Sequence, residues 1–240
     1  MELWVVIIFL LLVLYAVIPT VLARVFSVGV HKKATADHQF TLTFDDGPDP
    51  VYTPLLLDLL DHYHIKATFF VLGRNAEDHP ELIRRIHQEG HLIGIHHYTH
   101  IANWLLSPFQ ISRRINHTAD IVEEIIGERP VYYRPPWGLV TLADWFFYKR
   151  YRIVLWSLMV GDWASQKKQR TVGEKLIKGV GDGSIIVLHD SGATFGATED
   201  APKYMMEALQ TFLKETDSKG YTCVRMDHLL DSPHRSVSRC

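Results

Sequence analysis

Residues 39–50 read QFTLTFDDGPDP, an apolar, β-branched run that ends in two adjacent carboxylates, a glycine and a proline. The run from Gln39 to Asp45 predicts a strand, because β-branched and aromatic residues are enriched in strands. Asp, Gly and Pro are common turn residues, so one interpretation is a strand that simply stops in a turn. Two neighbouring carboxylates repel each other, however, and one face of a regular strand cannot take both. The rest of the chain decides between a plain turn and a functional pair.

Short apolar runs and amphipathic stretches alternate along the remainder of the sequence. Strands are predicted over 39–45, 67–72, 91–95, 131–134, 153–158, 184–188 and 221–225. Helices are predicted over 53–63, 76–89, 108–126, 139–150, 171–180 and 201–217. A strand followed by a helix, repeated about six times, predicts an α/β fold with a mainly parallel sheet.

The N-terminal segment differs in composition from the rest of the chain, because the run from Leu3 to Ala23 is apolar and carries no charge. It is about as long as a bilayer-spanning helix requires. It lacks the basic n-region of a secretory signal peptide and exceeds a usual h-region, although 21–23 would serve as a cleavage site. We therefore expect a single-pass membrane protein with an uncleaved anchor. The predicted divisions are a transmembrane anchor over 1–30, a linker over 31–38, a folded domain over 39–230 and a tail over 231–240.

The orientation of this anchor is ambiguous from charge alone. Arg24, Lys32 and Lys33 follow the apolar run, whereas only Glu2 and the terminal amine precede it. The positive-inside rule by itself would leave the main domain in the cytoplasm.

Composition excludes several classes of protein. The 240 residues are 47% hydrophobic and 22% charged, which is ordinary for a folded domain. The net charge of −2 is spread along the chain and predicts no nucleic-acid partner. The two cysteines, Cys223 and Cys240, are too few for a disulfide framework and do not settle the redox compartment.

Residues capable of chemistry stand directly after the predicted strands. In α/β folds, ligands bind in the loops beyond the carboxyl ends of the strands. The side that connects helices to strands carries no comparable set, so this asymmetry favours a functional site over chance turns. The strand ends in question carry Asp45-Asp46, His96 to His100, Arg134 to Gly138, Asp162-Trp163 and His189-Asp190.

A metal site follows from the residue types at these ends. His96 and His100 are four residues apart, which brings two imidazoles together on a helical turn or in a tight loop. Two histidines with one carboxylate suit a catalytic divalent ion such as zinc, with coordination positions left open. Only one aspartate of the pair at 45–46 need bind the ion, and the other is then available as a general base. A nearby dication also offsets the repulsion between the two carboxylates.

Five motifs, TFDDGPD, HHYTH, RPPWG, GDW and VLHD, occur in this order between residues 39 and 228. They resemble those of the polysaccharide deacetylases, carbohydrate esterase family four. The resemblance implies a distorted (β/α) barrel of about seven strands. It implies that Asp45 is the general base and that Asp46, His96 and His100 hold the metal. Arg134 would pair with the base and keep it ionised.

The same resemblance implies the second half of the site. His189 would be the general acid that protonates the leaving amine, and it needs a neighbouring carboxylate to raise its pKa. Asp162 is the first candidate for that carboxylate and Asp190 the second. The residues implied to contact the substrate are Trp137 and Trp163, which would wall the pocket, and Val187, which would touch the acetyl methyl group.

Two positions depart from the family pattern. His97 occupies a place that is commonly Ser or Thr, and we expect it to be a solvated bystander beside the ligand pair. Met159 occupies a place that is commonly Asp, which puts the efficiency of His189 in doubt but leaves the metal site intact.

The sequence thus predicts a metal-dependent hydrolase that removes N-acetyl groups from an N-acetylglucosamine-type polymer or oligomer and releases acetate. Zinc is the expected cofactor, with cobalt, nickel or manganese as alternatives. An O-acetyl esterase, a hydrolase of small cyclic amides and a glycan-binding relative without turnover remain open. The substrate implies a membrane protein with its catalytic domain outside the cytoplasm, and no protein partner is implied.

Overall fold

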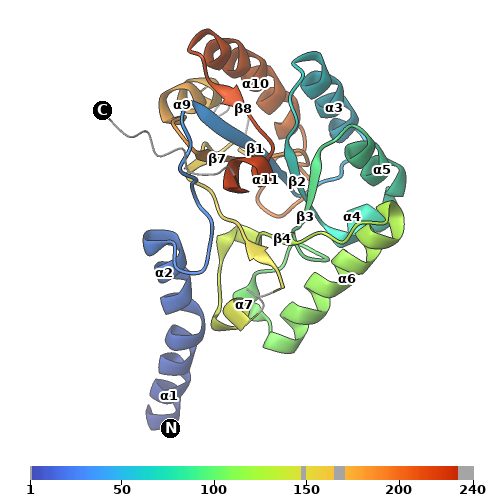
Figure 1. The fold of residues 1–240 in the computed structure, drawn as a ribbon. Coiled ribbons are helices and arrows are strands. Elements are labelled where there is room, and N and C mark those ends of the chain that lie inside the picture. Colours follow the sequence, from blue (N-terminus) through green and yellow to red (C-terminus); the bar gives the residue numbers. More distant parts are fainter. Residues whose placement is uncertain (1, 147–149, 165–170, 232–240) are drawn as a thin grey trace.

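The computed structural model describes residues 2–146, 150–164 and 171–231, in which an N-terminal helix projects from an α/β domain (Figure 1). The strands are β1 (Gln39–Asp45), β2 (Thr68–Val71), β3 (Leu92–Ile95), β4 (Tyr132–Tyr133), β5 (Arg152–Ile153), β6 (Leu158–Met159), β7 (Ser184–His189) and β8 (Thr222–Cys223). The α-helices are α1 (Glu2–Leu12), α2 (Ile18–Phe26), α3 (Tyr52–His62), α4 (Gly73–Asp78), α5 (Pro80–Gln88), α6 (Pro108–Ile126), α7 (Leu142–Phe146), α9 (Val172–Gly179), α10 (Ala201–Ser218) and α11 (Met226–Asp231). Short helical turns are η1 (Val13–Val17), η2 (Asn103–Leu105) and η3 (Pro136–Gly138).

All strand pairs in the sheet are parallel, in the order β5-β4-β3-β2-β1-β7-β6, and β8 pairs with β1. β5 and β6 are the two ends of this order, yet only residues 154–157 separate them along the chain. A stretch this short spans about 14 Å at most, so the sheet must curl until its ends approach each other. The predicted (β/α) barrel of about seven parallel strands is confirmed as a half-barrel.

One face of β1 carries apolar side chains and the other carries polar side chains. Phe40, Leu42 and Phe44 pack into the main hydrophobic core, to which α3, α5 and α10 contribute buried aliphatic and aromatic side chains. Thr41, Thr43 and Asp45 alternate with them and are also buried, on the other face of the strand. The interior of the barrel is therefore polar at this strand, and it can accept a charged partner.

Two predicted elements are divided in the structure. The helix predicted over 76–89 is two helices, α4 and α5, which meet at His79. Pro80 follows this residue, and a proline disfavours the helical conformation of the residue before it. The strand predicted over 153–158 is divided between β5 and β6, because the chain turns from one edge of the half-barrel to the other. Of the helix predicted over 139–150, α7 is observed, and 147–149 lie outside the described residues.

The N-terminal helix, over Leu3–Phe26, is long and apolar enough to cross a membrane. Its final turns pack on the domain: Ala23 is buried in a core cluster, and Thr20 Oγ1 donates to the carbonyl of Val140 at 2.6 Å. The expected linker over 31–38 also touches the domain. His31 and Lys33 form isolated bridges with Val154 and Ser184.

Candidate active site

The parallel sheet brings the predicted residues to one edge, because the carboxyl ends of parallel strands lie together. Asp45 ends β1 and His189 ends β7, and the two residues are register neighbours. His96 follows β3 directly, and Arg134 follows β4. A cavity of about 570 Å³ opens at this edge. The predicted residues that line it are Asp45, Asp46, His96, His100, Trp137, Trp163, Val187 and His189.

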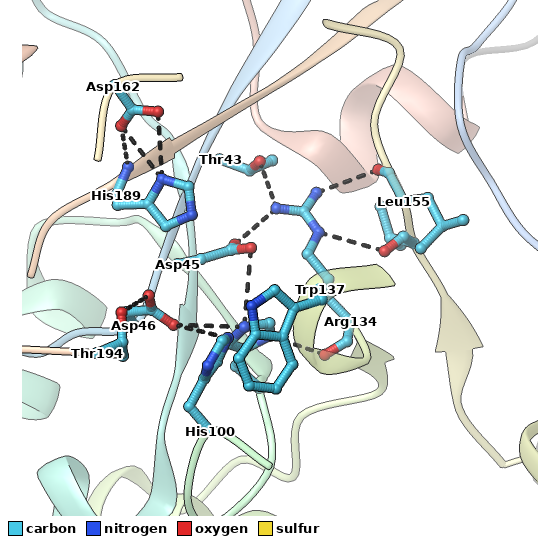
Figure 2. A network of polar contacts seen from close by, with 12 residues as sticks. Thr43, Asp45, Asp46, His100, Arg134, Trp137, Leu155, Asp162, His189 and Thr194 are labelled. Atoms are coloured by element: carbon cyan, nitrogen blue, oxygen red, sulfur yellow. Dashed lines mark hydrogen bonds and ion pairs between the residues drawn. The ribbon is translucent and has the colours of Figure 1, made fainter. Parts of the chain in front are cut away.

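Asp46, His96 and His100 form a cluster of ligand atoms, and Asp46 and His100 of this cluster are labelled in Figure 2. Asp46 Oδ1 lies 3.4 Å from His96 Nε2 and 3.5 Å from His100 Nε2. This oxygen is buried and has no hydrogen-bond partner among the residues that the structure describes. A buried carboxylate oxygen without a partner is costly, and a cation bound at this position would complete its environment. The three side chains therefore fit a divalent metal ion.

The tautomer of His96 suits metal binding. Its Nδ1 lies 2.8 Å from the carbonyl oxygen of Arg134, which can only accept a hydrogen bond, so Nδ1 carries the proton. Nε2 then presents its lone pair toward Asp46 and His100. Burial lowers the pKa of His96 to about 3, and it also lowers the pKa of His100. Both imidazoles are thus neutral at physiological pH, as metal ligands must be.

The backbone of Asp46 explains how both carboxylates reach the same cavity. Its φ of 77° lies in the left-handed region, so the alternation of β1 ends at this residue. As a result Asp45 Oδ2 also approaches His96 Nε2, at 4.0 Å. Thr194 Oγ1 donates to the second oxygen of Asp46 at 2.7 Å and orients this carboxylate. Both carboxylates thus face one cavity, and a plain turn does not account for this arrangement.

Arg134 fills the interior of the half-barrel and is fully buried. Its Nη1 donates to Asp45 Oδ1 at 2.6 Å and to Thr43 Oγ1 at 2.8 Å. Its other nitrogens donate to the carbonyls of Val154 and Leu155, and its guanidinium lies 4.1 Å from the centroid of the Phe70 ring. A guanidinium held by so many partners fixes Asp45 in position and neutralises its charge.

His189 and Asp162 lie on the opposite side of Asp45 from Arg134 (Figure 2). The backbone N–H of His189 donates to Asp162 Oδ2 at 2.7 Å, and its Nδ1 lies 3.2 Å from both oxygens of that carboxylate. Burial alone would lower the pKa of His189. The charge and hydrogen bond of Asp162, together with the charges of Asp45 and Asp46, outweigh burial and raise this pKa to about 10. The imidazole is thus protonated at neutral pH and can act as an acid.

Asp190, the second candidate partner of His189, faces elsewhere. Its carboxylate accepts a hydrogen bond from Thr53 Oγ1, and burial raises its pKa to about 7. It also packs against Gly47, where an added Cβ would meet its two oxygen atoms at 2.2 and 2.5 Å. Asp190 therefore shapes the loop after β1, and Asp162 is the carboxylate that contacts the imidazole.

Aromatic side chains wall the cavity. The ring of Trp137 lies 4.1 Å from that of His100, between centroids, and Trp163 contacts His189 edge-on at 5.2 Å. Trp137 is partly exposed, with a φ of 54°, and Val187 is a buried residue of the cavity lining. Met159 also lines the cavity, so the departure from the family pattern replaces a carboxylate with an apolar side chain beside the site.

The expectation that His97 is solvated is wrong. Its side chain is fully buried, its ring lies 5.9 Å from that of Tyr133, and burial lowers its pKa to about 3. It does not belong to the ligand cluster, so it leaves the choice of metal alone. The reason is its φ of 71°, which turns the side chain away from those of His96 and His100.

Sequence reasoning missed several residues that line the cavity, among them Thr194, Trp156 and Arg24. Thr194, which binds Asp46, and Trp156 both line the cavity, but neither belongs to a recognised motif. Arg24 also lines it, from the last turn of the N-terminal helix, and donates to the carbonyls of Gly138 and Trp137. In the sequence, Arg24 is marked only by its charge at the end of an apolar run. That charge was used to predict the orientation of the helix in the membrane, and it gave no indication that Arg24 lines the cavity.

Comparison with known proteins agrees with this geometry. A peptidoglycan-N-acetylglucosamine deacetylase of Bacillus cereus is 35% identical over 76% of this chain. The chain spans 66% of the length of that relative and 40–41% of two longer ones. A crystal structure of a peptidoglycan N-acetylglucosamine deacetylase matches 88% of this chain and 97% of its own, at 29% identity and a TM-score of 0.78.

A family 4 acetyl xylan esterase from Clostridium thermocellum, solved in complex with a cobalt ion, is 33% identical, with a TM-score of 0.70. The match covers 80% of this chain and 89% of the esterase. The family model for polysaccharide deacetylase matches residues 32–151. With the five motifs gathered around one cavity at the strand ends, the chain belongs to the polysaccharide deacetylase family.

Proposed function

We propose that this protein is a metal-dependent hydrolase that removes N-acetyl groups from N-acetylglucosamine-type glycans and releases acetate. The observation that carries the proposal is one cavity lined by a carboxylate base, a ligand cluster and an imidazole acid. Asp45 is the base and His189 the acid, and the relatives named above support the amide of an amino sugar as the bond that is cleaved.

Asp46, His96 and His100 would hold the metal ion. When bound, a divalent ion supplies Lewis-acid polarisation of the acetyl carbonyl and makes the attacking water more acidic. We infer zinc, because two neutral imidazoles and one carboxylate are a common zinc set. Cobalt, nickel and manganese suit similar ligands. The cobalt ion in the related esterase supports a transition-metal site of this kind.

The side chains carry the two proton transfers. Asp45 accepts a proton as water adds to the acetyl carbon, and its ion pair with Arg134 holds it in place for this step. The C–N bond then breaks, and protonated His189 gives its proton to the departing nitrogen. The products are acetate and an amino sugar. Trp137 and Trp163 flank the cavity as surfaces for a sugar ring.

Val187 and Met159 supply the apolar surface for the acetyl methyl group. Val187 is buried in β7, two residues before His189, and it lines the same cavity as Met159. An apolar floor of this kind suits a methyl group and offers no partner to a larger polar acyl group.

We further infer that the N-terminal helix anchors the protein in a membrane with the catalytic domain outside the cytoplasm. The helix is 24 residues long and mostly exposed. Under the positive-inside rule, Arg24 counts against this orientation. Arg24 also has a structural role, because it donates hydrogen bonds to the carbonyls of Gly138 and Trp137. That structural use weakens the argument from charge, and a cell-wall glycan lies outside.

The test of the proposed function is acetate release by the full-length protein. N-acetylglucosamine oligomers are expected to yield acetate and free amines, and O-acetylated xylan is the matched ester substrate. Ester hydrolysis with no amide hydrolysis would instead support the esterase alternative, which the related acetyl xylan esterase favours. Binding of oligomers without release of acetate from either substrate would support a relative without turnover.

Asp162→Asn is expected to move the basic limb of the pH profile of kcat/KM to lower pH. His189 must be protonated to act, and its pKa is raised chiefly by Asp162 against the effect of burial. Removing the opposite charge lowers that pKa by about 1–3 units. Activity at alkaline pH is then lost earlier, while activity on the acidic side is retained better.

Asp190→Asn is the matched control for this experiment, because Asp190 follows His189 in sequence but binds Thr53. It should leave the basic limb in place. A basic limb that moves in Asp190→Asn and stays unchanged in Asp162→Asn would show that the partner of the imidazole is assigned wrongly.

A further inference from the structure

Four exposed apolar side chains belong to the two segments that pack against the N-terminal helix, and we call them the apolar rim. The exposed fractions are 79% for Leu105, 74% for Phe109, 37% for Leu142 and 77% for Phe146. Leu105 and Phe109 flank Leu106, whose carbonyl accepts a hydrogen bond from Tyr15 of the helix at 3.3 Å. Leu142 and Phe146 belong to α7, which packs against η1 of the helix (Figure 1).

The length of the free part of the helix is too short for a bilayer. α1 projects from the domain (Figure 1) and has 11 residues, which at 1.5 Å each span about 16 Å. The hydrocarbon core of a bilayer is about 30 Å thick and takes about 20 helical residues. A spanning helix must therefore place η1 and the start of α2 within the hydrocarbon as well. The domain segments that pack against η1 reach the same depth.

Those segments present no charge to the lipid. Residues 103–110 read NWLLSPFQ, and α7 reads LADWF with Asp144 as its one charged side chain. Asp144 is buried and accepts hydrogen bonds from Asn103 Nδ2 at 2.8 Å and from Thr141 at 2.7 Å. The contact between Asn103 and Asp144 also ties the two segments of the rim to each other.

The polar groups of the helix at this depth have partners in the domain. Tyr15 donates to Leu106, Thr20 donates to Val140, and Thr20 accepts from Trp104 Nε1 at 3.1 Å. Polar groups at membrane depth must be satisfied by the protein, and these are. Trp104 adds an aromatic residue of the type that is enriched at membrane interfaces.

We propose that the apolar rim inserts into the bilayer that the N-terminal helix spans, so that lipid covers Leu105, Phe109, Leu142 and Phe146. This proposal rests on the membrane anchor of the proposed function. It has a consequence for the site, because Arg24 lies in the last turn of the same helix and lines the cavity beside Trp137. With the rim inserted, the cavity lies at the level of the lipid headgroups and takes glycan within reach of the membrane surface.

The experiment measures lipid contact at single labelled positions. Cys223→Ser and Cys240→Ser give a cysteine-free full-length chain, and cysteine is introduced singly at Leu105, Phe109 and Phe146. The environment-sensitive fluorophore NBD is attached, and the protein is reconstituted in phosphatidylcholine vesicles with or without doxyl groups on the acyl chains. Phe9→Cys in α1 reports the anchor itself, and Leu55→Cys, exposed on α3, is the matched control.

Acyl-chain doxyl lipid is expected to quench the labels at 105, 109 and 146 as well as the label at 9, and to leave the label at 55 unquenched. Quenching at position 9 alone would overturn insertion of the rim and would still support the N-terminal helix as a membrane anchor. A blue-shifted emission at the rim without quenching would mean that protein covers it, which also overturns the proposal. No quenching at position 9 would remove the anchor and the rim together. Acetate release by each labelled protein tests the hydrolase separately.

Discussion

Replacement of Asp45 with asparagine is expected to lower kcat/KM for acetate release by about 10²- to 10⁴-fold, the usual contribution of a positioned general base. Asparagine has nearly the same shape but cannot accept the proton of the attacking water. Asp45 Oδ2 faces the ligand cluster while Oδ1 is held by Arg134, so no other described carboxylate is placed in the same way. Steady-state acetate release from N-acetylglucosamine oligomers measures the loss.

The same substitution leaves Arg134 buried beside a neutral amide, and breaking a buried ion pair costs about 3–5 kcal/mol of stability. Thr43→Val separates this effect from loss of the base, because it removes a second acceptor of the same guanidinium and keeps the carboxylate. Activity should fall far less in Thr43→Val, at a temperature where thermal melts show both variants folded. Equal losses in the two variants would assign Asp45 a structural role only.

Removal of the metal is expected to lower activity by at least about 10²-fold, since a Lewis acid contributes several kcal/mol and each 1.4 kcal/mol is about tenfold. Activity should return on addition of zinc or cobalt. Metal binding should also raise the Tm of the chelated protein, because an ion that binds only the folded state stabilises it. Neither effect is expected for Asp46→Ala, which lacks the carboxylate that both imidazoles face.

Asp182→Asn is the control for metal binding. Asp182 belongs to a second group of potential ligands, with Asp37 and His38, that is exposed at a different place. Elemental analysis after dialysis should find about one equivalent of metal in Asp182→Asn and in the unmodified protein, and none in Asp46→Ala. One tightly bound equivalent in Asp46→Ala would refute the ligand set.

Much of the site could be predicted because each of its parts is local in sequence. Strand ends are marked by the change from apolar residues to Asp, His, Arg or Trp, as at Asp45 and His189. In a parallel sheet all of these ends lie at one edge. The prediction of the cavity residues therefore needed no knowledge of strand order. The spacing of His96 and His100 within one turn predicted the ligand pair in the same way.

The predictions from sequence failed where backbone conformation, or contacts between residues far apart in the chain, determine the structure. His97 was expected in solvent, but its φ of 71° and the proximity of Tyr133 bury it. Arg24 was interpreted by membrane rules alone, because nothing near it in sequence indicates that Gly138 lies within hydrogen-bond distance. The division of the strand predicted over 153–158 depends on the curvature of the sheet, which apolar periodicity does not encode.

The amino-acid order alone was enough for the fold class, the apolar N-terminal span and the inventory of chemical groups at the strand ends. Periodicity and residue type act over a few neighbours, and these features need no more than that. Residue order by itself did not decide which groups meet. The pairs of Asp162 with His189 and of Arg134 with Asp45 were implied only by the family resemblance, and the tertiary structure brings them together. The contact between the final turn of the helix and the loop at Trp137 came from the tertiary structure alone. Those contacts join residues far apart in the chain, so they depend on sheet order, register and left-handed backbone conformations that only the folded molecule has.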